Sequence, residues 1–340
     1  MNRNVTISRR ALAFAAAVAL LFTFGCGQAA ADKSAAEEVK PEIVAVDDGS
    51  ANTESAGAAE NVSYAGIYHV DETTDEAASG SYASSTPDEN TVLVENAGVL
   101  TMNSADLNKT GDAESDFSAG TNAAVAVVSG GQMSLQESNV TSNARGGFGL
   151  FAGGAGATLN LGGSFVYTSG ESSPALVVRG GGVVSLTGGT LSTEGEDSPC
   201  LLLSGGIVTL SGVTLSATSG EQLRVLSGTN ELTLDNTVLS AKPVLAEGTT
   251  LKLVLVNGAS FTGELGATLP AKVSVSLDAA SKLILTADTN LVTLINADTT
   301  HQNIQSNGFS IYYDSNAPEN AYLESQSFAL PGGGYLTPII

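Results

Sequence analysis

Acidic side chains are the residues of this chain whose types and spacing most resemble a binding site. Asp112, Glu114 and Asp116 alternate along one short stretch. Calcium prefers carboxylate and carbonyl oxygens, so these three residues form a candidate calcium site, although the stretch lacks the glycine and distal glutamate of an EF-hand loop. Calcium is the one cofactor that the sequence suggests.

A second acidic set recurs at a fixed interval. Glu171, Glu196 and Glu221 each follow a glycine, and they are equally spaced along the chain. Stacked in register, they would form a column of like charges, which is unfavourable unless water or a cation screens it. The sequence favours a solvated row of turns and leaves open a row that binds cations.

Catalytic chemistry has less support. Polysaccharide hydrolases need clustered carboxylates that act as acid, base or nucleophile, and lyases need a basic residue near the substrate. The only histidines are His69 and His301, and the only arginines beyond the N-terminal region are Arg145, Arg179 and Arg224. The sequence therefore predicts a non-catalytic protein, with a polysaccharide lyase or hydrolase as the alternative.

Charge and composition restrict the partners. The 340-residue chain carries a net charge of −22, with 39 glycines, no tryptophan and 42% hydrophobic residues. Such a charge repels nucleic acid and anionic lipid headgroups, so neither is expected as a partner. Acidic glycans are disfavoured for the same reason, which leaves neutral glycans or a surface protein as partners of a chain expected to be a monomer.

Residues 1–31 have the pattern of an export signal. A basic segment with Arg9-Arg10, similar to a twin-arginine start, precedes an apolar stretch over 11–24 that is too short to span a bilayer. Two outcomes remain open. Residues 23–26 resemble a lipobox that would lipidate Cys26, and cleavage after Ala31 is the alternative. We favour a lipid anchor at the cell surface, which would be the only membrane contact.

Residues 32–88 are rich in Ala, Ser, Glu and Asp, and this composition predicts an acidic flexible linker. Residues 61–68, with two tyrosines four positions apart, are the exception, and an early strand or a cap on the body stays open there. The other cysteine, Cys200, would have no disulfide partner inside the chain if Cys26 is lipidated or removed. Cys200 aligns with Ala175 of the preceding repeat, so we interpret it as a small buried hydrophobic residue.

A sequence repeat organises the chain beyond the linker. Six apolar residues recur at steps of 33, 26, 25, 24 and 24, and each is followed five positions later by another apolar residue. The first series is Met102, Leu135, Leu161, Leu186, Leu210 and Leu234, and the second is Leu107, Val140, Val166, Leu191, Leu215 and Leu239. Alternation of buried and polar positions is typical of strands, and a sustained period of this length is typical of a solenoid.

The details favour one type of solenoid. Each repeat has short β segments between turns, and the drifting step excludes the strict hexapeptide rhythm of left-handed β-helices. Glycine pairs at 130–131, 181–182 and 205–206 supply the positive φ and the close backbone approach that corners need. We predict an all-β, right-handed parallel β-helix over residues 89–300, closed by a C-terminal cap over 301–340. Neighbouring coils would stack about 4.8 Å apart.

Several segments also resemble a known family. The stretch from "TPDENTVLVENAG" to "KTGD", the repeated "TSGESSPALVVRGGGVVSL" coils and the closing "SNGFSIYYD" are similar to exported bacterial adhesin-like β-helix proteins, over roughly residues 64–340. The resemblance implies a β-helix displayed at the cell surface. It also implies an adhesin-like or structural role, in which many weak contacts on a repetitive face add up to avidity.

Overall fold

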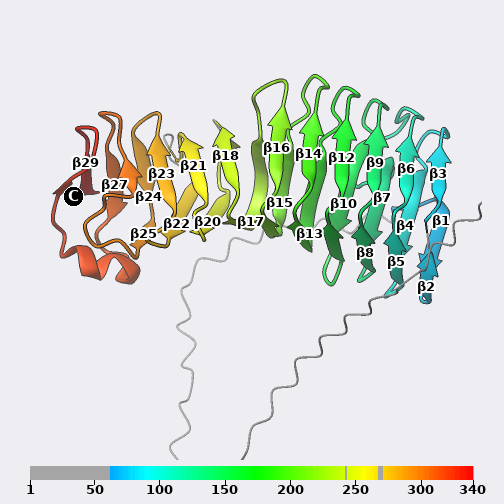
Figure 1. Ribbon diagram of the computed structural model, residues 1–340, viewed down its shortest axis with the longest axis horizontal. Helices are drawn as coiled ribbons and strands as arrows, with labels where there is room; N and C mark the ends of the chain where they lie inside the picture. The colour runs from blue at the N-terminus through cyan, green and yellow to red at the C-terminus, as the bar shows by residue number, and fades with distance from the viewer. Residues whose placement is uncertain (1–61, 78, 242, 267–270, 340) are drawn as a thin grey trace, which may run out of the picture. The chain divides into compact units, whose positions relative to one another are not determined.

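The computed structural model describes residues 62–77, 79–241, 243–266 and 271–339, and within these ranges the protein is all-β. Parallel strands stack into a β-solenoid of about 11 coils (Figure 1). One sheet of 15 strands runs along the stack, and sheets of six, four and four strands complete the coils. The predicted parallel β-helix is confirmed.

The coils up to β16 contain short strands that lengthen where two segments merge across a glycine corner. They are β1 (Gly66–Asp71), β2 (Thr74–Ala77), β3 (Ser81–Ser84), β4 (Asn90–Glu95), β5 (Val99–Asn103), β6 (Asp106–Lys109), β7 (Ala123–Val128), β8 (Gln132–Gln136), β9 (Asn139–Ser142), β10 (Phe148–Gly153), β11 (Thr158–Gly162), β12 (Phe165–Thr168), β13 (Leu176–Thr187), β14 (Thr190–Thr193), β15 (Leu201–Ser211) and β16 (Thr214–Ala217).

The remaining coils are less regular and end in a short 3₁₀ helix and an antiparallel strand pair. They contain β17 (Leu223–Asp235), β18 (Val238–Ala241), β19 (Val244–Leu245), β20 (Thr250–Val256), β21 (Ser260–Gly263), β22 (Lys272–Leu277), β23 (Lys282–Leu285), β24 (Thr289–Leu291), β25 (Thr293–Asn296), β26 (Ile304–Gln305), β27 (Ile311–Asp314), η1 (Pro318–Leu323), β28 (Phe328–Ala329) and β29 (Tyr335–Ile339).

The core consists of the two apolar columns that the period predicts. In the first, every predicted neighbour pairs in register from Met102 to Leu234, and Leu255 and Leu277 extend the column. In the second, pairing is continuous from Leu107 to Leu215 and resumes from Leu239 onward. These side chains are at most 9% exposed, so each coil buries its apolar residues against equivalent residues of the neighbouring coils.

The glycine pairs occupy the corners for two different reasons. The first glycine of each pair has a positive φ that residues with a side chain rarely adopt: 80° at Gly130, 92° at Gly181 and 87° at Gly205. The second glycine of a pair lies against the preceding coil, where a Cβ on Gly182 would meet the carbonyl oxygen of Ala152 at 2.5 Å. The first position needs the backbone conformation and the second needs the space.

The solenoid begins earlier than the sequence predicts. Strands β1, β2 and β3 form a coil within residues 66–84, which the composition assigned to a flexible linker. The acidic residues that suggested a linker occupy exposed positions of this coil. Tyr68 and Tyr82 pack edge to face, with ring centroids 5.1 Å apart, against the first core residues. Composition alone therefore obscured a strand whose alternate residues face water.

The C-terminal region both continues and closes the stack. Strand β27 pairs in parallel with β24 and with β29, so coils extend into the segment predicted as a cap. Strand β28 pairs antiparallel with β29, and Tyr313 is fully buried. Within the described ranges, no helix is long and apolar enough to cross a membrane.

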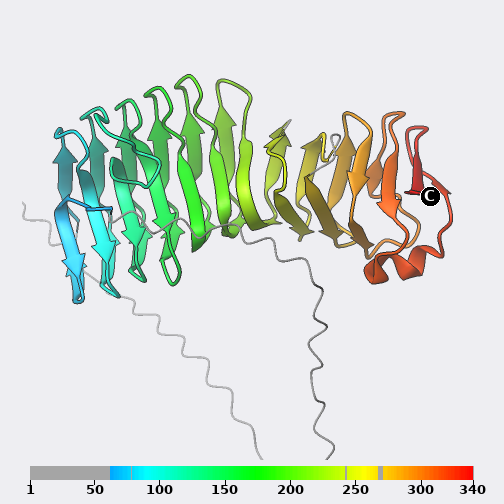
Figure 2. The same cartoon turned by 180° about the vertical axis from the view of Figure 1, so that it is seen from behind.

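The six-stranded sheet ends at β16, and the next sheet on that side begins at β18 (Figures 1 and 2). The amide of Gln222 spans this seam. Its Nε2 donates to the carbonyl of Leu215 at 3.2 Å, and its Oε1 accepts from the backbone N–H of Ser240 at 2.9 Å. A side-chain amide thus makes the two hydrogen bonds that backbone pairing would otherwise make.

Candidate functional site

The outer face of the 15-stranded sheet carries an apolar row. Strands β7 and β10 are buried along their whole length, as expected for strands covered on both faces. Successive outward-facing residues pair in register along this row: Leu93, Ala126, Phe151, Val177, Leu202 and Arg224. From Leu93 to Leu202 this row belongs to a second apolar cluster, outside the coil interior, and Arg224 ends it.

A loop over residues 110–122, between β6 and β7, covers the first part of the row. Phe117 packs edge to face on Phe148, with ring centroids 5.8 Å apart. The Tyr64 hydroxyl donates to the carbonyl of Ala119 at 2.9 Å, and burial raises the pKa of Tyr64. A Cβ on Gly120 would collide with the ring of Phe151, so only glycine allows the loop this close.

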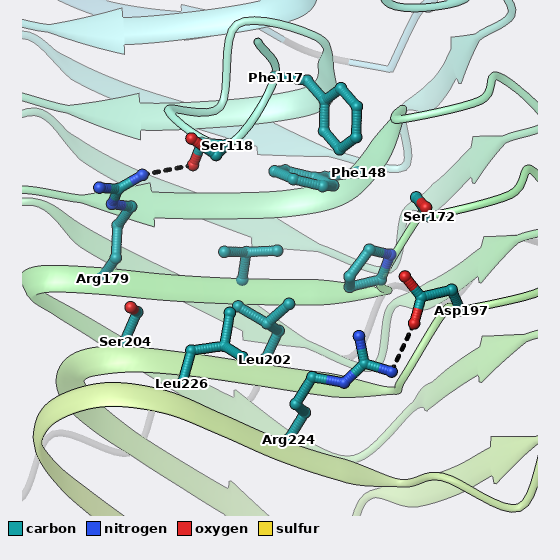
Figure 3. Close-up of a pocket in the computed structure, with 12 residues that line it drawn as sticks. Phe117, Ser118, Phe148, Ser172, Arg179, Asp197, Leu202, Ser204, Arg224 and Leu226 are labelled. Carbon is teal, nitrogen blue, oxygen red and sulfur yellow. Dashed lines mark hydrogen bonds and ion pairs between the residues drawn. The ribbon is translucent and has the colours of Figure 1, made fainter. Parts of the chain in front are cut away.

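Where the loop ends, the row opens into a groove of about 380 Å³ (Figure 3). Phe117 and Phe148 form one end and Leu226 lies toward the other, where it is 45% exposed. Pro174, Val177 and Leu202 supply further apolar lining. The groove therefore combines an apolar floor with polar rims on consecutive coils.

One rim is an ion-pair network around Arg224. Glu221 accepts two hydrogen bonds from the guanidinium, each 2.6 Å long, and Asp197 of the preceding coil lies 2.7 Å from Nη2 (Figure 3). These hydrogen bonds, first those to Glu221, raise the pKa of Arg224. Bidentate pairing fixes the guanidinium plane, so this rim is rigid, and the positive charge of Arg224 is fully paired.

The other rim carries Arg179, whose charge also helps to lower the pKa of Asp116, after the hydrogen bonds from Ser118. Its Nη1 donates to the carbonyl of Ser118 at 2.6 Å, which ties the loop to β13 (Figure 3). Within the described part of the chain, Arg179 forms no salt bridge. The guanidinium has five N–H donors, so most of them remain available to a ligand that carries a carboxylate.

The structure does not bring the predicted calcium ligands together. Asp112 accepts from the backbone N–H of Arg145 at 2.8 Å, and Asp116 accepts from that of Ser118, which lowers the pKa of Asp116. The backbone N–H of Glu114 donates to Asp88. The two aspartates fix the loop conformation through backbone donors, so their alternation reflects turn geometry. The three side chains are not among the described groups whose ligand atoms converge.

The acidic ladder is only partly in register. The backbone N–H of Ser172 donates to the carbonyl of Glu196, and both Glu171 and Glu196 are exposed at the same turn of successive coils. The next coil is shorter at this turn. Leu176 pairs with Leu201, and Leu201 pairs with Leu223, so the second interval contains fewer residues than the first. Glu221 therefore leaves the column and pairs with Arg224.

Two further predictions concern single residues, both of them cysteines. Cys200 is fully buried, as expected, and burial raises its thiol pKa to about 11. Cys26, the predicted lipidation site, lies outside the described residues. His301 is buried and edge-on to Phe328, at 5.1 Å between ring centroids.

Sequence inspection missed both the groove and a cluster at the start of the stack. Among the residues that the structure describes, one set of three metal-type ligands converges: His69, Asp71 and Glu95. The repeat offered the signal, because Asp71 and Glu95 are one coil step apart. The groove had a weaker signal, which was the apolar outward position of Leu202. Comparison with protein-family models, curated proteins and solved structures found no match to this chain.

Proposed function

We propose that the protein is an exported, non-catalytic surface protein that binds a protein partner through the groove beside the 110–122 loop. The observation that carries the proposal is the pairing of an open apolar floor with the guanidinium of Arg179, which has no salt-bridge partner among the described residues. Exposed apolar surface with a polar rim is typical of a recognition site. The export signal and the lipid anchor at Cys26 belong to the same proposal, as does the adhesin-like role that the sequence resemblance implies.

A protein segment fits this lining better than a neutral glycan does. Sugars usually stack on exposed aromatic rings, but Phe148 is buried and Phe117 is half-buried. Val177, Leu202 and Leu226 instead suit an aliphatic side chain, and Arg179 suits an adjacent carboxylate. We therefore expect a segment that combines an apolar residue with an acidic one.

The groove also lacks the features of a hydrolytic site in what the structure describes. Its acidic lining residue, Asp197, pairs with Arg224, and Glu221 is bonded to the same guanidinium. Carboxylates engaged in this way are poor acids or bases for a glycosidic bond. This arrangement favours binding over turnover.

The test is a peptide-display selection against the purified protein, run beside a neutral-glycan array. We expect enriched peptides to carry an apolar–acidic pair and to lose at least about tenfold in affinity with Leu226→Asp, which places a charge on the floor. Ile207→Asp is the matched control, since Ile207 on β15 is 46% exposed but does not line the groove. Arg179→Gln should weaken the acidic peptides selectively.

Two outcomes would overturn the proposal. One is binding of glycans or peptides that Leu226→Asp and Ile207→Asp affect equally. The other is release of reducing sugar or unsaturated product from a polysaccharide, abolished by Asp197→Asn. Attachment is tested separately, by incorporation of a fatty-acid probe that Cys26→Ser abolishes, and a mature N-terminus at Asp32 would refute the anchor.

A further inference from the structure

We propose that His69, Asp71 and Glu95 form a site for a divalent transition metal, with zinc as the best-suited ion, at the first two coils of the solenoid. The three side chains offer one imidazole nitrogen and two carboxylate oxygens, all within 4.8 Å of one another. Nothing in the groove contributes to this cluster, so the inference is independent of the proposed function.

The register of β1 and β4 creates the cluster. His69 and Asp71 are two positions apart on β1, so they point to the same face of the strand. Asp71 pairs directly with Glu95 on the adjacent parallel strand. Three ligands from two hydrogen-bonded strands are thus held by backbone pairing, which limits the conformational entropy that binding must overcome.

The charge arrangement favours a cation. Two carboxylates directly opposite each other on neighbouring strands repel. Nε2 of His69 lies 2.8 Å from Oε1 of Glu95, a hydrogen-bond distance that a tetrahedral zinc ion would widen to about 3.3 Å. Either a proton on His69 or a metal ion can offset this repulsion, and these alternatives predict different measurements.

Surrounding groups support the metal. Nδ2 of Asn96 donates to Oδ1 of Asp71 at 2.9 Å and orients that carboxylate, in the way that outer-shell partners orient ligands in metal sites. Glu72, Asp75 and Glu76 add negative charge on the same coil, which raises the local concentration of cations. The His69 side chain is 39% exposed, so an ion could enter and would keep water on its remaining positions.

The ligand types decide the class of metal. An imidazole with carboxylates suits zinc and similar first-row ions, whereas calcium prefers six to eight oxygens and magnesium retains most of its waters. The cluster supplies only two carboxylates besides the imidazole. We therefore expect zinc to bind well ahead of calcium or magnesium.

The experiment is calorimetric titration of tag-free protein, stripped of metal, with zinc chloride. We expect one zinc ion per chain, and at least about tenfold weaker binding in both His69→Ala and Glu95→Gln. Glu72→Gln is the matched control, since it removes the same charge from the neighbouring position without removing a ligand. Calcium chloride under the same conditions should give no saturable heat at this site.

A spectroscopic measurement that does not depend on affinity distinguishes a bound metal from a simple ion pair. Cobalt(II) substituted for zinc should give visible d–d absorption bands that disappear in His69→Ala and persist in Glu72→Gln. Absence of saturable zinc binding would overturn the proposal and leave only the His69–Glu95 hydrogen bond. Zinc binding that is equally strong in His69→Ala would also overturn it.

Discussion

The side-chain N–H of Gln222 donates a hydrogen bond to the carbonyl of Leu215 at the seam between β16 and β18. The side-chain oxygen of Gln222 accepts a hydrogen bond from the backbone N–H of Ser240 on β18. One side chain therefore bridges two strands that do not pair with each other. A hollow of about 380 Å³ lies beside it. The seam is therefore bridged by a side chain in place of a strand.

Replacing Gln222 should loosen this seam. Gln222→Leu removes both hydrogen bonds and should cost about 1–2 kcal/mol of unfolding free energy, chiefly from the part-buried carbonyl of Leu215, since water can reach the exposed N–H of Ser240. Hydrogen exchange should accelerate over β16 and β18 and remain unchanged over β12. Gln136→Leu, on a half-buried position of β8, is the control. Equal protection of β16 and β18 in wild type and Gln222→Leu would contradict this role.

Gly195 should tolerate no side chain. A Cβ there would overlap the carbonyl oxygen of Gly170 on the preceding coil, and that backbone cannot move without breaking register. Gly195→Ala should lower the unfolding free energy by about 3 kcal/mol. Gly212→Ala, where φ is 63° but no atom lies within 4 Å, should cost only about 1 kcal/mol. Urea denaturation measures both, and similar losses would contradict the steric explanation.

Lys109 should make stability depend on pH in the alkaline range. The side chain is buried, its Nζ donates to the carbonyl of Thr86 at 2.6 Å, and burial lowers its pKa to about 8. Between pH 8 and the usual lysine pKa of 10.5, the unfolded chain retains a proton that the folded chain has lost. The Lys109 contribution to unfolding free energy should therefore become more favourable as pH rises through this window.

The measurement compares wild type with Lys109→Met by urea denaturation at several pH values. The stability difference should shift in favour of wild type from pH 8 to pH 10. Lys272→Met, which removes an exposed lysine from β22, controls for the loss of one positive charge. A difference that moves in the opposite direction would show that Lys109 is charged and well paired in the folded state.

Cys200 should be unreactive while the protein is folded. The thiol is fully buried, its Sγ lies 3.1 Å from the carbonyl of Ser216, and its pKa is raised to about 11. Because the thiolate is the reactive species, an aromatic disulfide reagent at pH 8 should label Cys200 only at the rate of unfolding. Cys26→Ser protein isolates this thiol, and the further change Cys200→Ala provides the blank. Rapid labelling under native conditions would contradict the burial.

The sequence repeat made the core residues predictable. Local changes in the pairing between coils, and the partners of the acidic side chains, could not be predicted from it. Leu135 and Leu161 could be paired from sequence because both lie in coils with the same offsets. Glu221 could not be placed, because the turn between β16 and β17 is shorter than its predecessor, and a register shift between β15 and β17 restores the period only by Leu234. Likewise, Asp112 and Asp116 look like metal ligands in one dimension, but backbone N–H groups are their partners. The first coil was hidden because its exposed acidic residues resemble those of a linker.

The seam has a consequence for how the protein unfolds. In a stack of repeats, cooperativity passes only between nearest neighbours, and it weakens wherever an interface between coils is reduced. At β16 and β18 one of the connecting sheets is interrupted, while β15, β17 and β20 remain joined on the other side. The coils before and after this point are thus coupled through one sheet, the apolar interior and a few side-chain hydrogen bonds, among them those of Gln222 and Thr237. Force or denaturant should separate the solenoid here into two cooperative blocks, each able to melt without the other.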